Sequence, residues 1–240
     1  VSDVKKVDIL DVFISGKNVK DLNLKGDASQ KLEKSLPPRE NTIKRKPIGP
    51  NDLNLTLSQG IYNVIEIIPD EIIINHLKVT YDGSQFNESD VLQIAVIERY
   101  GQELKPSIGL VKGTGLKTGA IASSVAHDSH NIIVIGKTKE EMALAVNTLI
   151  KEGGGFCVTE GDQVLSCLPL PIAGLLSLES AETITESIEE LRSSFKKIGV
   201  VLKELFLQMA FLALPVIPTL KITDKGLVDV TKFEFVSIKR

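Results

Sequence analysis

The spacing of apolar residues changes several times along the chain and predicts a mixture of strands and helices. Apolar runs of about four to eight residues, rich in Val and Ile and bounded by turn residues, are typical of strands. Such runs lie at residues 64–68, 71–81, 92–97, 119–126, 131–136, 156–159 and 163–168. The last two flank Glu160-Gly161-Asp162, which predicts a hairpin.

Two longer segments have helical spacing. Thr138 is the expected N-cap of the first helix, with Glu141 three residues later as the partner in a capping box. The apolar face then continues to Ile150, and Gly153-Gly154-Gly155 ends the helix. A second helix is expected over residues 180–198, whereas residues 205–212 fit a helix or a strand equally well.

The beginning of the chain differs from the rest. Residues 7–24 predict two strands joined by a turn at Ser15-Gly16-Lys17-Asn18, too little to bury a core alone. Residues 25–50 are polar and Pro-rich, which predicts a linker with one short helix near residues 30–35. We therefore expect an N-terminal part at residues 1–52 and a domain at residues 53–240. The pattern predicts an α+β fold, a mixed α/β sandwich.

Composition narrows the class of protein. The 240 residues are 42% hydrophobic and 25% charged, as in soluble globular proteins, and no apolar run is long enough for a transmembrane helix. The net charge of −3 provides no electrostatic footprint for nucleic acid, and Lys44-Arg45-Lys46 is interpreted as part of a solvated linker. The first residues do not form a signal peptide, and the chain begins with Val rather than Met, which favours a fragment or a processed chain.

The two cysteines, Cys157 and Cys167, lie in the two strands of the predicted hairpin. Their spacing does not match a structural zinc site. We expect buried free thiols, with a cross-strand disulfide as the alternative.

The most unusual local composition is Ala126-His127-Asp128-Ser129-His130-Asn131, between two apolar strands. Neutral imidazoles can bind metals or transfer protons near pH 7, and Asp128 can orient a histidine. Ser123, Ser124 and Asn131 can supply hydrogen bonds. The alternative is a polar turn whose side chains cap backbone groups. A metal site needs at least three ligands, and the third histidine, His76, lies in a separate strand.

Other motifs are weaker. Residues 113–119 resemble a phosphate loop but match neither the Walker nor the dinucleotide spacing, and Lys117 within them is a weak candidate for ligand binding. Glu98 and Arg99 end a buried strand and form either a catalytic pair or a structural ion pair. Gly-x-Ser-x-Gly is absent, which disfavours an ordinary serine hydrolase.

Several long motifs resemble the C-terminal domain of bacterial adenine deaminases, members of the amidohydrolase superfamily. They lie at residues 96–99, 113–131, 142–147, 153–155, 168–175, 211–218 and 223–230. Tyr100 and Thr114 depart from the residues expected in many relatives, a histidine and an aromatic respectively. Residues 1–50 resemble the segment that follows the family's catalytic barrel and adds strands to a small β domain.

The resemblance implies a hydrolase that converts adenine to hypoxanthine and ammonia in purine salvage, in the cytoplasm. It implies a manganese or iron cofactor bound by a barrel that this chain lacks, since no His-x-His motif occurs and a (β/α)₈ barrel alone needs about 200 residues. No metal is therefore expected within this fragment, which we expect to be inactive alone. Expected partners are adenine, the missing barrel and further copies of the chain.

Within the resemblance, His127, Asp128 and His130 are the expected catalytic groups. The expected substrate-binding residues are Asn131, Ser123, Ser124, Glu98, Arg99 and Lys117. A non-catalytic interaction or oligomerisation module remains the alternative function, and a self-contained hydrolase built on His127 and Asp128 is the weakest reading.

Overall fold

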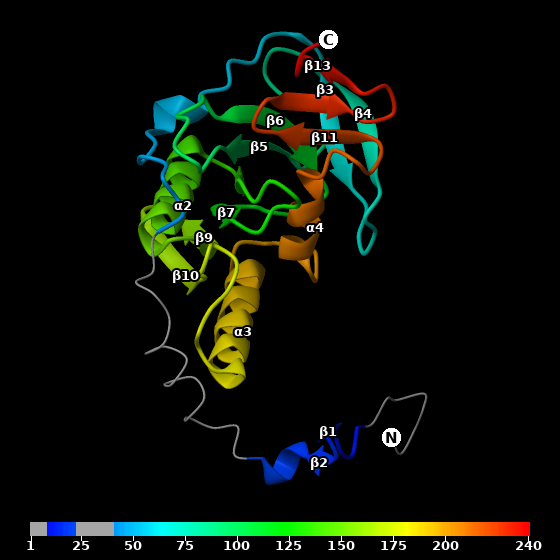
Figure 1. Cartoon of the computed structure of the whole chain (residues 1–240). Coiled ribbons are helices and arrows are strands. Elements are labelled where there is room, and N and C mark those ends of the chain that lie inside the picture. Colours follow the sequence, from blue (N-terminus) through cyan, green and yellow to red (C-terminus); the bar gives the residue numbers. More distant parts are fainter. Residues whose placement is uncertain (1–8, 23–40) are drawn as a thin grey trace. The chain divides into compact units, whose positions relative to one another are not determined.

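A computed structural model describes residues 9–22 and 41–240 (Figure 1). Residues 41–177 and 181–240 form one compact unit, and residues 9–22 belong to a separate one. The expected boundary at residue 52 stays a prediction, and the expected helix near residues 30–35 lies outside the described residues. No helix in the described part of the chain is long and apolar enough to cross a membrane.

The N-terminal unit contains a small hairpin. Strands β1 (Phe13–Ile14) and β2 (Lys17–Asn18) pair around Ser15-Gly16, both of which have positive φ. The predicted turn is thus confirmed, but both strands are only two residues long and are shorter than expected. After Asn18 the chain enters a 3₁₀ turn, η1 (Val19–Asp21), because the Asn18 side chain accepts the Lys20 N–H at 3.0 Å and caps it.

The larger unit is built on an eight-stranded sheet with the order β10-β9-β7-β8-β5-β6-β3-β4. Its strands are β3 (Gly60–Ile67), β4 (Ile74–Tyr81), β5 (Val91–Ile97), β6 (Ser107–Lys112), β7 (Ala120–Ser123), β8 (Ile132–Gly136), β9 (Gly155–Glu160) and β10 (Gln163–Pro169). All neighbours are antiparallel except β3 and β6. The α+β class is confirmed, and every strand predicted for this sheet is present within a few residues of its expected bounds.

One face of the sheet is covered by helix α2 (Lys139–Glu152) (Figure 1). Ile132 and Val134 of β8 point to this face, while Ile133 and Ile135 point to the other, as the period of two along a strand requires. Thr138 caps the helix by accepting the Glu141 N–H, and Gly153 ends it in the left-handed conformation. Residues 43–53, including the 3₁₀ turn η2 (Pro50–Leu53), bury three apolar side chains in the same layer.

The other face packs against a second layer of three elements. These are α3 (Ala181–Lys197), α4 (Leu205–Leu212) and a three-stranded sheet of β11 (Leu220–Thr223), β12 (Gly226–Asp229) and β13 (Glu234–Val236). Their apolar side chains share one core cluster with the large sheet. The sequence fitted either a helix or a strand at residues 205–212, and the structure shows that they form the helix α4. The larger unit is therefore a sandwich in which the eight-stranded sheet lies between α2 on one face and the layer of α3, α4 and the small sheet on the other.

The last residues of the chain complete the large sheet beside β3. Asn63 donates its N–H to the Ile238 carbonyl at 2.9 Å, and Arg240 donates its N–H to the Ile61 carbonyl at 2.9 Å. The Asn63 side chain also donates to the Ser237 carbonyl at 2.7 Å. The N-terminal half of β3 thus has β4 on one side and residues 237–240 on the other.

Candidate functional site

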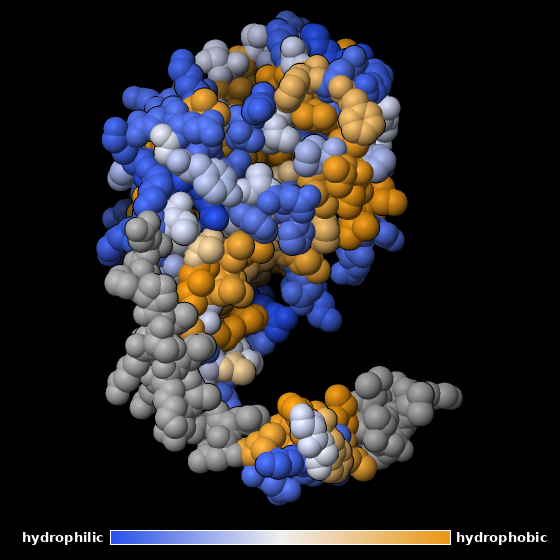
Figure 2. Space-filling view, in the orientation of Figure 1, coloured by the Kyte–Doolittle hydropathy of each residue, from blue (hydrophilic) through white to orange (hydrophobic). Residues whose placement is uncertain are grey.

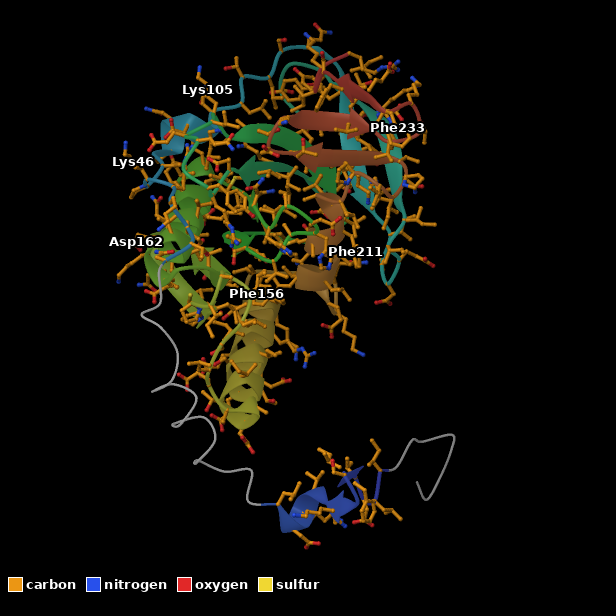
Figure 3. All side chains as sticks on the ribbon, viewed as in Figure 1. Lys46, Lys105, Phe156, Asp162, Phe211 and Phe233 are labelled. Carbon is orange, nitrogen blue, oxygen red and sulfur yellow. The ribbon has the colours of Figure 1, made fainter. Side chains whose placement is uncertain are left out.

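The His-rich segment is the connection between the neighbouring strands β7 and β8, and it lies against α4. Residues 127–129 form a turn, which His130 closes by donating its N–H to the Ala126 carbonyl at 2.6 Å. His127 donates its N–H to the Ala210 carbonyl of α4 at 3.1 Å. The His127 ring lies 5.4 Å from the ring of Phe211, which is labelled on α4 in Figure 3. Helix α4 therefore fixes the position of the connection.

The two imidazoles lie side by side at this connection. Their ring centres are 6.1 Å apart, and both side chains are partly buried. Burial lowers the pKa of His130, and the positive charge of Arg99 and the proximity of His127 lower it further, while Asp128 opposes the change. His130 is thus neutral at pH 7 and can accept or donate a proton. Its Nδ1 atom is buried and has no hydrogen-bond partner among the residues described.

Arg99 reaches the same place from the end of β5, the neighbour of β8. Only 4% of this residue is exposed, and its Nη2 donates to the Ala173 carbonyl at 2.8 Å. Nε and Nη1 have no partner in the described part of the chain. Gly174 leaves the room that the guanidinium occupies, since a Cβ there would lie 2.2 Å from Nη1. A buried cation with unused donors can hold an electron-rich group of a ligand or of another segment.

Hydrogen bonds lock the end of β5 to the His-rich segment. Asn131 accepts the Arg99 N–H through Oδ1 at 3.3 Å, and the Tyr100 hydroxyl donates to the Ser129 carbonyl. The carboxylate of Glu98 accepts the N–H groups of Tyr100 and Gln102, so it caps the turn after β5. The structure therefore gives Glu98 and Asn131 positioning contacts to the backbone beside Arg99.

The two serines are buried and hold backbone groups. Ser123 accepts the Val125 N–H through Oγ at 2.9 Å. Ser124 donates to the Gly174 carbonyl at 2.6 Å and accepts the Gly155 N–H at 2.7 Å. These contacts fix the loop around Arg99. The Ser124 hydroxyl both donates one hydrogen bond and accepts one, so its hydrogen-bonding capacity is used within the protein.

Two of the expected site residues are not drawn into these contacts. Lys117 precedes β7, so it lies at the opposite end of that strand from His127, where its side chain packs beside Gly199. Asp128 is exposed, and within the described ranges no hydrogen bond to its carboxylate is present, although it acts electrostatically on His130. The structure therefore brings His127, His130 and Arg99 together and leaves Lys117 apart.

The described residues do not provide a metal site. No three His, Cys, Asp or Glu side chains within residues 9–22 and 41–240 come close enough to hold an ion. His76 is in β4, where its Nε2 lies 2.9 Å from the Asn63 Oδ1. Ser129 is hydrogen-bonded to the Asn131 N–H at 3.5 Å, and no serine–histidine hydrogen bond occurs in these ranges. Within these ranges the geometry therefore offers neither a metal centre of three ligands nor a serine–histidine pair, and the self-contained hydrolase built on His127 and Asp128 stays a prediction.

The sequence did not predict that glycines provide the space around the Arg99 side chain. Gly153-Gly154-Gly155 predicted only the end of a helix, but a Cβ at Gly154 would lie 2.4 Å from the Gly174 Cα. The triplet therefore also lets the segment after β10 cross close to the start of β9. One residue in the left-handed conformation is enough to end a helix. Three consecutive glycines were therefore the signal in the sequence that this segment has a second role.

Comparison with known proteins supports the same family. A model of the adenine deaminase C-terminal domain family matches residues 70–234. An adenine deaminase of Bdellovibrio bacteriovorus is 57% identical over 239 residues, 100% of this chain and 41% of that protein. Adenine deaminases of Shewanella halifaxensis and Shigella sonnei are 50% and 46% identical, again over 41% of their length.

The chain thus spans about two fifths of the length of these relatives, and the motif-based resemblance is confirmed. The family match extends over most of the large sheet, both helical layers and the His-rich connection. The chain belongs to the adenine deaminase C-terminal domain family.

Proposed function

We propose that this chain is the C-terminal portion of an adenine deaminase and that its His-rich connection completes the purine site of that enzyme. The reaction is the hydrolysis of adenine to hypoxanthine and ammonia, in the cytoplasm and as part of purine salvage. The observation that carries the proposal is the cluster of the buried Arg99 with the partly buried His127 and His130, in a chain whose relatives are adenine deaminases.

The cluster matches the chemistry that a purine requires. Arg99 has unused N–H donors, and the neutral His130 offers a nitrogen that is unpaired within the described chain. Ring nitrogens of adenine accept hydrogen bonds, and its amino group must gain a proton before it leaves as ammonia. We assign Arg99 to substrate binding, His127 and His130 to proton transfer, and Asp128 to the electrostatic stabilisation of a protonated His130. Asn131, Ser123, Ser124 and Glu98 position the surrounding backbone.

The metal belongs to the portion of the relatives that this chain does not span. The resemblance implies manganese or iron, but the described residues do not fit a metal ion, so we derive no step through it. When bound, such an ion lowers the pKa of its water and supplies hydroxide. The contribution of this chain is to bind and orient the purine and to hold or move a proton.

Adenine consumption, followed by ultraviolet absorbance with added manganese, tests the proposal. The chain alone should show no turnover. A chimera in which it replaces the matching two fifths of the Bdellovibrio enzyme should be active. In that chimera, His127→Ala or Asp128→Asn should lower turnover far more than the unfolding temperature. His76→Gln is the matched control, because His76 lies in another strand.

Two results would contradict the proposal. Unchanged kinetics with a large fall in unfolding temperature for His127→Ala would make the His-rich connection a capping turn. Robust turnover by the chain alone, abolished by His127→Ala, would mean that the chemistry is self-contained.

A second function, an interaction module, is favoured by the apolar segment, which we define as residues 9–14 and which ends in strand β1. Ile9, Leu10, Val12, Phe13 and Ile14 are all exposed, and this segment is largely orange in Figure 2. Such an exposed cluster, next to a two-stranded hairpin that is marginally stable alone, is typical of a surface that another chain segment covers. We propose the remaining three fifths of the enzyme as its occupant, and a homo-oligomer as the assembled state. Phe13→Ser should weaken assembly of the chimera in light scattering, whereas Val201→Ser, an exposed position of the other unit, should not.

A further inference from the structure

The hairpin β9–β10 holds both cysteines of the chain at directly opposed positions. Cys167 pairs with Cys157 in the ladder register. Three residues beyond Cys167, Leu170 donates its N–H to the Gly154 carbonyl at 3.0 Å. Hydrogen-bonded and non-hydrogen-bonded pairs alternate along an antiparallel ladder, so the cysteines occupy a non-hydrogen-bonded pair. Cα atoms in such pairs are about 4.5 Å apart, within the range that a disulfide spans.

Both thiols point to the same side of the sheet. Cys157 belongs to the apolar cluster beneath α2, and Cys167 packs against that cluster. The proximity of the two thiols lowers the pKa of Cys167 and raises that of Cys157, which burial also raises. The register and the shared face therefore place the two thiols next to each other, and both are free in this structure.

The two thiols differ in access. Strand β10 is the last strand of the sheet, and Cys167 is only partly buried there. Cys157 is fully buried, one strand further in. An oxidant in solution can therefore reach Cys167 first, while Cys157 can react only with its neighbour.

We propose that Cys157 and Cys167 are a modification site, a dithiol that a low-molecular-weight disulfide such as oxidised glutathione converts reversibly to an intrachain disulfide. The Cys167 thiolate attacks one sulfur of oxidised glutathione, breaks its S–S bond and releases one glutathione. Cys157 gives up its proton and attacks the Cys167 sulfur of the mixed disulfide, which releases the second glutathione. Two protein thiols are oxidised and one glutathione disulfide is reduced to two thiols.

The bridge would act beside the candidate site. The segment that follows β10 supplies the Ala173 carbonyl to Arg99 and the Gly174 carbonyl to Ser124. Oxidation would fix β10 to β9 and restrict the opening of this segment. We therefore expect backbone amides of residues 170–176 to exchange hydrogen more slowly in the oxidised chain.

The test is a titration of the folded 240-residue chain in glutathione buffers of increasing oxidation, followed by acid quench, alkylation and mass spectrometry. Both thiols should disappear together, with loss of the mass of two hydrogen atoms and no retained glutathione. The thermal unfolding midpoint should rise by about 5–10 °C, because the bridge closes a short loop of the unfolded chain. Reduced glutathione should reverse both changes.

Two variants separate the steps. Cys157→Ser should accumulate one glutathione at Cys167, and Cys167→Ser should leave Cys157 unreactive. The proposal is wrong if the wild-type chain retains two thiols at the most oxidising buffer, keeps glutathione on Cys167, or forms only disulfides between chains. Equal rates of bridge formation in folded chain and in urea would also overturn it, because the register would then have no role.

Discussion

Replacing Glu141 tests whether one buried carboxylate joins three elements of the larger unit. Only 8% of the residue is exposed. Its Oε1 accepts the Gly119 N–H at 3.1 Å and the Gly161 N–H at 2.9 Å, and its Oε2 accepts the Thr138 hydroxyl at 2.8 Å. The start of α2, the segment before β7 and the β9–β10 turn therefore meet at this side chain.

The expected cost follows from these contacts. Hydrogen bonds to charged groups contribute about 1.5–3 kcal/mol each, and losses within one network are not additive. Glu141→Ala leaves the buried Gly119 N–H without its acceptor, while water can reach Gly161. We expect a loss of about 3–5 kcal/mol in the free energy of unfolding. Glu141→Gln keeps an acceptor for both N–H groups and should lose about 1–2 kcal/mol.

Urea unfolding followed by circular dichroism measures both variants. Glu140→Ala is the matched control, because Glu140 is the exposed neighbour on the same helical turn and should change stability by no more than about 0.5 kcal/mol. If Glu141→Ala falls within about 1 kcal/mol of Glu140→Ala, the carboxylate does not hold the three elements together and the reasoning is refuted.

Two further predictions concern a glycine and a histidine. Gly119→Ala should destabilise the chain at least about 2 kcal/mol more than Gly161→Ala in urea unfolding, because a Cβ at Gly119 would lie 2.1 Å from the Thr159 carbonyl oxygen, whereas nothing lies within 4 Å at Gly161. Equal losses would contradict the backbone contact, since both positions have positive φ. Burial chiefly lowers the pKa of His76, against the opposing charge of Asp229, so the unfolded state binds the proton more readily. Stability should therefore fall as the pH drops below about 6.5, and this slope should be smaller in His76→Gln; an unchanged slope would show that His76 does not cause it.

Most of the strands could be predicted because each is short, apolar and bounded by turn residues. β6 was missed because Pro106 precedes it and Gly109 lies in its middle, and both residues are depleted in strands. The structure gives the reason for Gly109: a Cβ there would lie 3.1 Å from Ile222 and 3.2 Å from Leu227 of the small sheet. The glycine at this position allows the two sheets to pack closely. The local sequence pattern contains no information on that contact.

Helix α4 remained undecided for a different reason. Seven of its eight residues are apolar, so neither a period of 3.6 nor a period of two is visible. Its one polar residue, Gln208, is buried and donates to the Ile68 carbonyl at 2.9 Å. Tertiary contacts rather than amphipathicity therefore decide its conformation.

The candidate site could be found in part. The composition of residues 126–131 was unusual enough to identify the His-rich connection. The proximity of Arg99 depends on the pairing of β5 with β8, although β6 and β7 separate them in sequence. Likewise, the second half of the expected capping box was wrong in detail, because the Glu141 carboxylate binds Gly119 and Gly161 instead of the Thr138 N–H. Both features arise from contacts between distant segments.

The pairing of residues 237–240 with β3 has a consequence during synthesis. Asn63 is made about 175 residues before Ile238, its hydrogen-bond partner, which at roughly 5–20 residues per second is a delay of about 9–35 s. Throughout that delay the N-terminal half of β3 has an open edge, and open strand edges pair readily with other chains. In a growing chain this edge of β3 can therefore be covered by residues 237–240 only after they have been made, and until then it is a place where association between chains can begin.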